Sequence, residues 1–340
     1  LRNKINNSLS IVKMHNRHVD KKKEINYCYQ LLKVYHDLIK LDLTKSESLD
    51  MIISVGDMLY HDSKPSGEKL AESIQQGFKC IVDSELNKLP WSFVFGNHDE
   101  PSFKIQPPCT YRNALISNIE STFNLGNPEY QLMFKNYVDT DFSENTKFLD
   151  SHNLVILNIN TNIFEMKSKK GKIEPECTYA KNKEFIDHLK SLDNITKKDN
   201  LSNLASELNN RNKNPNKNDT FDEQKVLKYL SEIKTVNLLK NSLNYYERLN
   251  IDRRNNKIKV IIVGHHPMIM KGHKKGKLHK FYGNIFMKFI YENIIRNYNC
   301  CIAYLSGHEH GLQMLEDITN VTSNKDTFKF IISGSGGGNS

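Results

Sequence analysis

The sequence predicts an α/β fold, and two observations carry that prediction. Short apolar runs rich in β-branched or aromatic residues alternate along the chain with longer segments whose apolar residues recur at helical spacing. Four of the apolar runs are followed by a turn that contains glycine and polar side chains able to bind a metal. Because open α/β sheets place their ligands just beyond the carboxyl ends of the strands, we expect these side chains at one edge of a sheet.

The expected elements follow from these two periodicities. Apolar residues at helical spacing predict amphipathic helices that pack on a sheet, over residues 24–40, 69–86, 111–123, 226–249 and 282–295. Apolar runs predict strands over residues 51–55, 91–95, 131–137, 154–159, 257–263, 301–305 and 328–332. Residues 8–12 resemble the remnant of an earlier strand.

Four turns after these strands carry the candidate functional residues. The turns read GDMLY at residues 56–60, GNHD at 96–99, GHHP at 264–267 and SGHEHG at 306–311. Two histidines close together are common on protein surfaces, so the last turn alone would indicate little. Four strand ends with aspartate, asparagine and histidine together predict a metal site.

In this order the four motifs resemble those of the calcineurin-like metallophosphoesterases. Within that superfamily Tyr60, three residues after Asp57, makes the chain most similar to the purple acid phosphatases of the small tartrate-resistant type, as do residues 306–313 and 331–336. The resemblance extends from about residue 50 to residue 337. It implies a four-layer α/β/β/α metallophosphatase sandwich of two mixed sheets flanked by helices, with the metals at the strand ends.

The resemblance departs from the family at the first motif. The family opens with Asp-x-Gly on its first strand, and no match to it is present here. Residues 8–12 lie nearest to the expected place, and His15 is an alternative occupant of the aspartate position. We therefore expect a motif that is either truncated upstream or degenerate.

The resemblance implies a dinuclear metal centre. One metal would be bound by four side chains, namely Asp57, Asn97, His265 and His308. The other metal would share Asp57 as a bridge and would be bound by Tyr60, His310 and the missing first-motif aspartate. A tyrosinate favours ferric iron, and mixed oxygen and nitrogen donors suit zinc, manganese or ferrous iron. The expected cofactors are two metal ions, iron together with zinc, manganese or a second iron; the alternative for Tyr60 is a core aromatic residue.

Three residues carry the implied catalysis. Asp57 would contribute as the bridging carboxylate, and His98 would contact the phosphate and help to protonate the leaving oxygen. His273, eight residues after His265, resembles a second histidine with the same role, although a solvated basic loop is an alternative for it. Asp99 and His266 are expected to orient a metal ligand or catalytic residue, such as His98, without binding a metal themselves.

The implied function is hydrolysis of phosphate monoesters by attack of a metal-bound hydroxide, since two metals can activate a water, hold the phosphate and neutralise developing charge. The substrate would be a phosphorylated small molecule or a phosphoprotein.

Two alternatives to this function stay open. The missing aspartate and a long insertion would also fit a catalytically impaired scaffold or interaction protein. A phosphodiesterase or protein phosphatase of the same superfamily is the other, although Tyr60 argues against the zinc and manganese subfamilies. Loops at residues 100–112 and 271–281 would select the substrate.

The net charge of +9 does not by itself predict nucleic-acid binding. The lysines lie in loops and low-complexity runs without interleaved aromatic residues, so no nucleic-acid partner is expected, and a basic rim would attract phosphorylated substrates. No apolar run approaches the roughly 20 residues of a membrane helix, so no transmembrane segment is expected. A secretory or vacuolar route would fit if a signal peptide lies upstream.

We expect one metallophosphoesterase domain over residues 1–340. An Asn/Lys-rich, low-complexity insertion at about residues 165–225 interrupts it. Such a composition buries too little apolar surface to offset its ordering entropy, so we expect a largely disordered surface segment around a short helix at residues 183–192.

Overall fold

The computed structural model describes about half of the chain. The described residues are 51–57, 90–97, 99, 109–123, 128–164, 168–169, 172–173, 230–231, 233–253, 256–274, 277–282, 285–309, 311–317 and 327–333. They include most of the residues expected around the strand ends.

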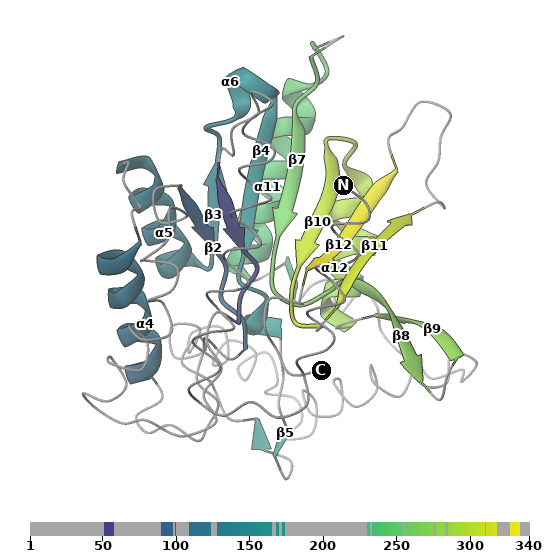
Figure 1. The fold of residues 1–340 in the computed structure, drawn as a ribbon. Coiled ribbons are helices and arrows are strands. Elements are labelled where there is room, and N and C mark those ends of the chain that lie inside the picture. Colours follow the sequence, from purple (N-terminus) through teal and green to yellow (C-terminus); the bar gives the residue numbers. More distant parts are fainter. Residues whose placement is uncertain are drawn as a thin grey trace, which may run out of the picture.

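The largest element is a six-stranded sheet with the order β11-β12-β10-β7-β4-β3 (Figure 1). Its strands are β3 (Phe142–Asn145), β4 (Leu154–Ile159), β7 (Lys259–Val263), β10 (Cys301–Ser306), β11 (Leu312–Asp317) and β12 (Phe328–Ser333). The four central strands β4, β7, β10 and β12 are parallel, and the two edge strands β3 and β11 are antiparallel to their neighbours. The sheet is therefore mixed, and its parallel strands end at one edge.

A second pair of strands packs on one face of this sheet. Strands β1 (Ile52–Ser54) and β2 (Trp91–Phe93) are parallel. Buried residues that follow β2, Val94 and Phe95, belong to one apolar cluster with Ile156 of β4 and Val263 of β7. The parallel pair and the six-stranded sheet thus form two adjacent β layers.

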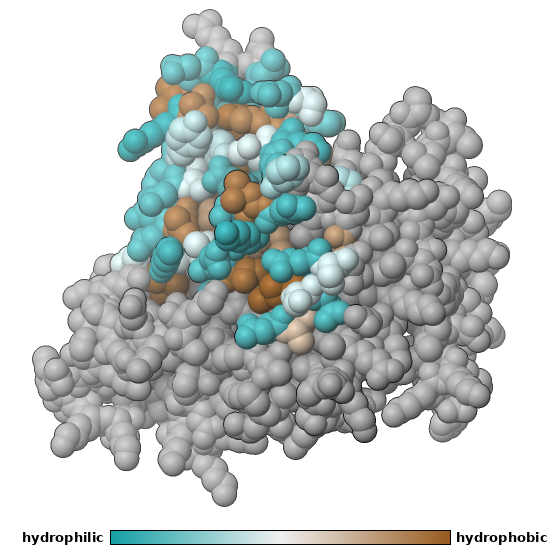
Figure 2. Space-filling view, turned by 90° about the vertical axis from the view of Figure 1, so that its left-hand side faces the viewer, coloured by the Kyte–Doolittle hydropathy of each residue, from teal (hydrophilic) through white to brown (hydrophobic). Residues whose placement is uncertain are grey.

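Two helices cover the outer side of the β1–β2 pair. Helices α4 (Cys109–Thr122) and α5 (Pro128–Thr140) place Leu115, Ile119 and Tyr137 in the same cluster. The ring centres of Phe123 and Trp91 lie 5.1 Å apart in an edge-to-face contact. Figure 2 views the molecule from this side, where hydrophilic and hydrophobic residues alternate over the described surface.

Two further helices cover the opposite face of the large sheet. Helices α11 (Lys234–Leu249) and α12 (Ile285–Asn293) pack on side chains of β4 and β7 that alternate with those facing the other sheet. For example, Val155 and Leu157 belong to this second cluster, whereas Ile156 between them belongs to the first. The order of layers is α/β/β/α, as the resemblance implies, and the α/β fold class is confirmed.

Most of the expected elements in the described part of the chain are confirmed. Strands β1, β2, β4, β7, β10 and β12 lie where apolar runs predict them, and α4, α11 and α12 lie where helical spacing predicts them. The smaller elements are α6 (Leu149–His152), η2 (Thr161–Phe164), η3 (Ile295–Asn297), β5 (Ser168–Lys169) and β6 (Lys172–Ile173). The expected helices at residues 24–40, 69–86 and 183–192 lie outside the described residues, as does most of the insertion.

The prediction of a strand over residues 131–137 is wrong, because this segment belongs to helix α5. The buried side chains of α5 are Tyr130, Met133, Phe134 and Tyr137. Their spacing of three, four and seven residues is that of one helical face. An apolar run this short fits either structure when it is viewed alone.

Four of the longer strands were not predicted from the sequence. They are the edge strands β3 and β11 and the two strands of a hairpin, β8 (Ile269–Lys274) and β9 (Lys277–Tyr282). The hairpin leaves the large sheet directly after the turn that follows β7 (Figure 1). None of the described helices is both long and apolar enough to span a membrane.

Candidate metal centre

The two β layers bring four turns to one edge of the molecule. Asp57 follows β1 and Asn97 follows β2, and these two strands are parallel. His265 follows β7 and His308 follows β10, which are parallel neighbours in the large sheet. Residues 57, 97, 265 and 308 therefore meet although more than 200 residues of chain separate the first from the last.

The donor atoms of these four side chains converge on one small volume. Asn97 Oδ1 lies 3.1 Å from His265 Nε2 and 3.0 Å from His308 Nδ1. His308 Nδ1 lies 3.3 Å from His265 Nε2, and Asp57 Oδ2 lies 3.4 Å from that same nitrogen. Donor atoms that share a tetrahedral metal at about 2.0–2.1 Å are themselves about 3.3 Å apart. Asn97, His265 and His308 therefore have the mutual spacing of ligands around one metal ion, and Asp57 lies at the same spacing from His265.

His265 is oriented for metal binding by its other ring nitrogen. Nδ1 lies 2.8 Å from the backbone carbonyl oxygen of Val55, which can only accept a hydrogen bond. Nδ1 therefore carries the proton, and the lone pair on Nε2 faces Asn97 and Asp57. A histidine ligand held through a carbonyl in this way is typical of metal sites.

The centre favours positive charge at His265. Burial alone would lower the pKa of this fully buried imidazole. The hydrogen bond and negative charge of Asp57, together with the carbonyl of Val55, outweigh that effect and raise its pKa overall. A metal cation bound among these groups would supply the positive charge that a proton on His265 otherwise supplies.

Glycines allow the two turns of the small sheet to approach His265. A side chain on Gly56 would place its Cβ 2.7 Å from His265 Nδ1, and one on Gly96 would place it 2.7 Å from His265 Cε1. Gly56 also has a φ of 91°, and Asp57 has a φ of 56°. Left-handed backbone is uncommon for an aspartate and is often found at functional sites. The close approach requires glycine at both positions.

Asp99 links the same two turns. Its Oδ2 accepts hydrogen bonds from the backbone nitrogens of Asp57, at 2.7 Å, and of Gly96, at 2.9 Å. Burial, and after it the negative charge of Asp57, raises the pKa of this carboxyl from 3.8 to about 7, although the Gly96 bond opposes the rise. Asp99 thus supports a ligand through its backbone, in the kind of role that the sequence predicts for it.

Two supporting residues were missed by the sequence reasoning. Thr161 and Asn162 begin η2, immediately beyond the carboxyl end of β4. Asn162 Nδ2 donates hydrogen bonds to the carbonyl oxygens of Phe95 and Gly96, both at 3.1 Å. Thr161 Oγ1 accepts the backbone N–H groups of His265, at 3.1 Å, and His266, at 3.0 Å. The available signal was their position after β4, a parallel strand of the large sheet that also ends near these turns.

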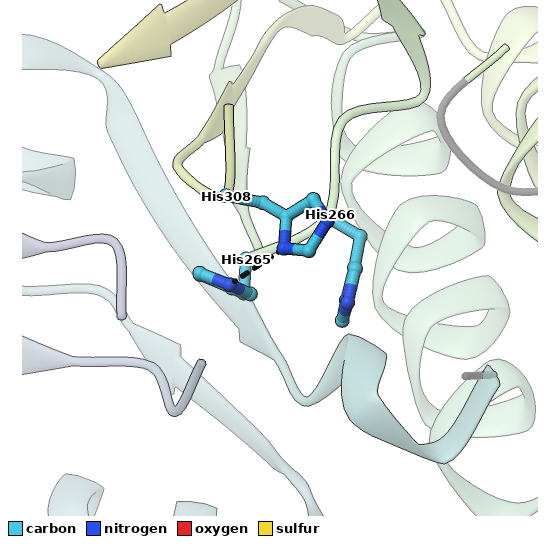
Figure 3. A group of neighbouring side chains, drawn as sticks. All are labelled: His265, His266 and His308. Atoms are coloured by element: carbon cyan, nitrogen blue, oxygen red, sulfur yellow. Dashed lines mark hydrogen bonds between the residues drawn. The ribbon is translucent and has the colours of Figure 1, made fainter. Parts of the chain in front are cut away.

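A third histidine lies beside the two candidate ligands. Figure 3 shows His265 and His266 on the turn after β7 and His308 on the turn after β10. One ring nitrogen from each of these residues lies within 4.8 Å of one from each of the others. The ring centres of His266 and His308 are 4.6 Å apart. His266 is therefore part of the cluster, although its hydrogen bonds differ from those of His265.

The remaining candidates stay predictions. Tyr60, His98 and His310 lie outside the described residues, as does His15. His273 lies in strand β8, with Leu278 of β9 as its Cα partner, and its side chain is outside what the structure describes. Of the predicted site residues, the structure brings together Asp57, Asn97, His265 and His308.

Comparison with known proteins identifies a family that the chain matches. A family model described as calcineurin-like phosphoesterase matches residues 15–312. Among solved structures, the chain is similar to a dimetal phosphatase from Danio rerio with 13% sequence identity and a TM-score of 0.41, over 85% of this chain and 73% of that one. Likeness at this level adds nothing on function. No curated protein matches the chain.

Proposed function

The chain belongs to the calcineurin-like phosphoesterase family, and we propose that within this family it is a dinuclear phosphatase of the purple acid phosphatase type that hydrolyses phosphate monoesters. Membership makes it a metal-dependent phosphoesterase whose substrates are phosphorylated. The proposal adds the monoester preference, the number of metals and the residues that bind them.

One observation carries the proposal. Donor atoms of Asn97, His265 and His308 lie 3.0–3.3 Å from one another, which is the spacing of ligands around one metal ion, and Asp57 Oδ2 lies 3.4 Å from His265 Nε2. We assign this first metal to Asp57, Asn97, His265 and His308. The second metal would share Asp57 and take Tyr60 and His310, with a further ligand from the first motif.

The metals would supply a water activated for attack and positive charge for the phosphate. The side chains of this chain provide the rest. Val55 and Asp99 hold His265 and Asp57 in place through the bonds described above. When the phosphorus–oxygen bond to the leaving group breaks, the leaving oxygen must gain a proton, and His98 and His273 are the proposed donors.

Tyr60 decides the metal pair in this proposal. A phenolate ligand stabilises ferric iron, and the donors of the first metal suit zinc, manganese or ferrous iron. A ferric–tyrosinate pair absorbs visible light. The expected result is a visible absorption band in the iron-loaded protein that is lost on Tyr60→Phe, while Tyr245→Phe, at an exposed tyrosine of α11, retains it.

The direct test is hydrolysis of an aryl phosphate by the full chain loaded with iron, zinc or manganese. We expect metal-dependent turnover that falls by about two orders of magnitude or more on His265→Ala, since the ligand is lost. His152→Ala, at an exposed histidine of α6, is the matched control and should retain activity. A metal-loaded protein that hydrolyses no monoester would contradict the proposal and favour the scaffold. Turnover of diesters alone would favour a phosphodiesterase.

The domain boundaries are part of the proposal. We propose one metallophosphoesterase domain over residues 1–340 with an Asn/Lys-rich insertion at about 165–225. The support is that the family model spans the insertion from residue 15 to residue 312. Removing residues 175–225 should therefore leave aryl phosphate turnover within about threefold of the full chain, because loop length has a weak effect on stability.

A further inference from the structure

Thr161 makes three hydrogen bonds through one hydroxyl group. Its Oγ1 lies 3.1 Å from the backbone nitrogen of His265, 3.0 Å from that of His266, and 2.9 Å from His266 Nδ1. Thr161 and His265 are fully buried and His266 is nearly so. The partners of this hydroxyl are therefore fixed by the protein and not by solvent.

The number of lone pairs on a hydroxyl determines the sense of each bond. A threonine oxygen has two lone pairs and one hydrogen. Backbone N–H groups can only donate, so His265 and His266 use both lone pairs. The hydroxyl hydrogen remains, and it must be directed to Nδ1 of His266.

His266 Nδ1 is therefore a hydrogen-bond acceptor, and the ring carries its hydrogen on Nε2. His265 is the reverse, since its Nδ1 donates to the carbonyl oxygen of Val55 at 2.8 Å. Two adjacent histidines are thus held in opposite tautomers. His265 presents a lone pair from Nε2, which a metal requires, whereas His266 presents an N–H group, which an anion requires.

We propose that Thr161 fixes His266 as a hydrogen-bond donor to a phosphate oxygen of the substrate, so that the third imidazole of the cluster serves the anion and not the metal. Thr161 is a positioning residue in this account, and His266 is a further substrate-binding residue. The substrate role rests on the proposed phosphatase function; the tautomer does not.

Proximity supports the proposal. The ring centre of His266 lies 4.9 Å from that of His265 and 4.6 Å from that of His308, so the His266 ring lies directly beside both candidate ligands, with its Nε2 buried. The alternative, in which His266 binds the metal through Nε2, would move the hydrogen to Nδ1. Nδ1–H would then face an oxygen whose two lone pairs are already used.

The local packing prevents the turn at residues 264–266 from moving away from Thr161, so an Nδ1–H group on His266 could not avoid the Thr161 oxygen. Tyr304 donates a hydrogen bond from its hydroxyl to the carbonyl oxygen of His266 at 2.7 Å. A Cβ on Gly264 would lie 2.7 Å from Cγ2 of Thr161, so the Thr161 methyl packs directly on the turn. Both contacts hold the backbone of residues 264–266 against Thr161.

The first test reads the tautomer in the metal-free full chain. Two-bond ¹⁵N–¹H correlations of histidine rings distinguish a hydrogen on Nε2 from one on Nδ1, and the His266 signals are assigned by their loss in His266→Gln. We expect the Nε2–H pattern in the natural chain and in Thr161→Ser, which retains the hydroxyl. Thr161→Val should lose that preference. A natural chain with Nδ1–H at His266 would overturn the proposal.

The second test separates a metal ligand from an anion ligand. Metal content and the affinity for inorganic phosphate are measured for the metal-loaded natural chain, for His266→Leu, which cannot donate a hydrogen bond, and for the exposed control His152→Leu. We expect His266→Leu to retain the metal content of the natural chain and to bind phosphate about tenfold more weakly, as loss of one buried hydrogen bond implies. A fall in metal content, or unchanged phosphate affinity, would overturn the proposal.

The two tests also distinguish this inference from the proposed function. If the natural chain takes up no metal, the dinuclear proposal fails, and the substrate role of His266 fails with it. The tautomer remains measurable in that protein. If His266 carries its hydrogen on Nε2 and the chain takes up metal normally but binds no phosphate, only the proposed role of His266 in phosphate binding is rejected.

Discussion

The carboxylate of Asp99 lies 2.7 Å from the backbone nitrogen of Asp57 and accepts its hydrogen bond. The same oxygen accepts the backbone N–H of Gly96, so one buried side chain joins the turns after β1 and β2. The position of the Asp57 carboxylate thus depends on a residue 42 positions away.

Removing this carboxylate should weaken metal binding. Asp99→Ala leaves two backbone N–H groups without their acceptor, which costs about 1–3 kcal/mol each when they stay buried. We also expect about a 10- to 100-fold loss of metal affinity, the usual effect of losing a residue that supports a ligand. Chemical denaturation and metal titration measure the two effects. Glu120→Ala, at an exposed position of α4, should change neither; equal effects from both variants would contradict the assigned role.

The metal-free protein should lose stability as the pH rises. The pKa of Asp99 is raised from 3.8 to about 7 and that of His265 is raised as well, so the folded state binds protons more tightly than the unfolded state at both residues. For Asp99 this contribution is complete below pH 3.8 and is lost as the pH rises to about 7. Urea denaturation at several pH values should show that fall, and Asp99→Asn should reduce its slope.

The same protons should leave when a metal binds. A cation beside Asp57 and His265 replaces the charge that the protons supply, and metal ligands must be deprotonated. Titration calorimetry in buffers with different ionisation enthalpies should therefore show proton release at about pH 6. Metal binding without proton release would place the ion elsewhere.

A methyl group at Gly96 should disrupt the centre. A Cβ there would collide with the Asp57 backbone nitrogen and carboxylate, and it would lie 2.7 Å from the His265 ring. We expect Gly96→Ala to abolish metal binding and to cost about 1–3 kcal/mol of stability, which is typical of overpacking. Gly311→Ala is the control, because a Cβ at Gly311 meets no atom within 4 Å. Gly96→Ala with normal metal affinity would show that the turns do not need to approach so closely.

The hairpin of β8 and β9 should raise the affinity for phosphorylated substrates. Its register places Lys271 opposite Lys280 and Lys274 opposite Lys277, and no acidic residue occurs between Ile269 and Tyr282. Like charges opposite each other destabilise a strand pair, and an anion nearby would offset that repulsion.

Replacing Lys271 and Lys280 by glutamine should therefore raise the KM for a phosphorylated substrate about three- to tenfold. It should also reduce the dependence of kcat/KM on salt, with kcat little changed. Lys135→Gln combined with Lys240→Gln, at exposed positions of α5 and α11, is the charge-matched control. The same change in KM for both pairs would mean that net charge alone is responsible.

The sequence predicts which strand ends carry the candidate ligands better than it predicts the segments around them. Asp57, Asn97, His265 and His308 follow four apolar runs, and parallel strands necessarily end at one edge, so pattern and topology together locate them. The apolar run at residues 131–137 wrongly predicts a strand, because a run this short fits both the strand and the helix period. Only the buried positions Tyr130, Met133 and Tyr137 reveal the helix.

The supporting residues could not be predicted because their roles depend on contacts between distant segments. Thr161 lies about a hundred positions from the histidines that it contacts, and a threonine after a strand has no special composition signal. The tautomers of His265 and His266 depend on a carbonyl of Val55 and a hydroxyl of Thr161. Identical side chains thus acquire different chemistry from the backbone around them.

Metal content of the full chain is the measurement that tests the central claim most directly. Elemental analysis should find close to two metal ions per chain in the natural protein and no more than one in His308→Ala, because that variant loses a nitrogen 3.3 Å from His265 Nε2. His152→Ala should retain the natural content. A His308→Ala variant with undiminished metal, or a natural chain that binds none, would contradict the assignment of Asp57, Asn97, His265 and His308 as a metal centre.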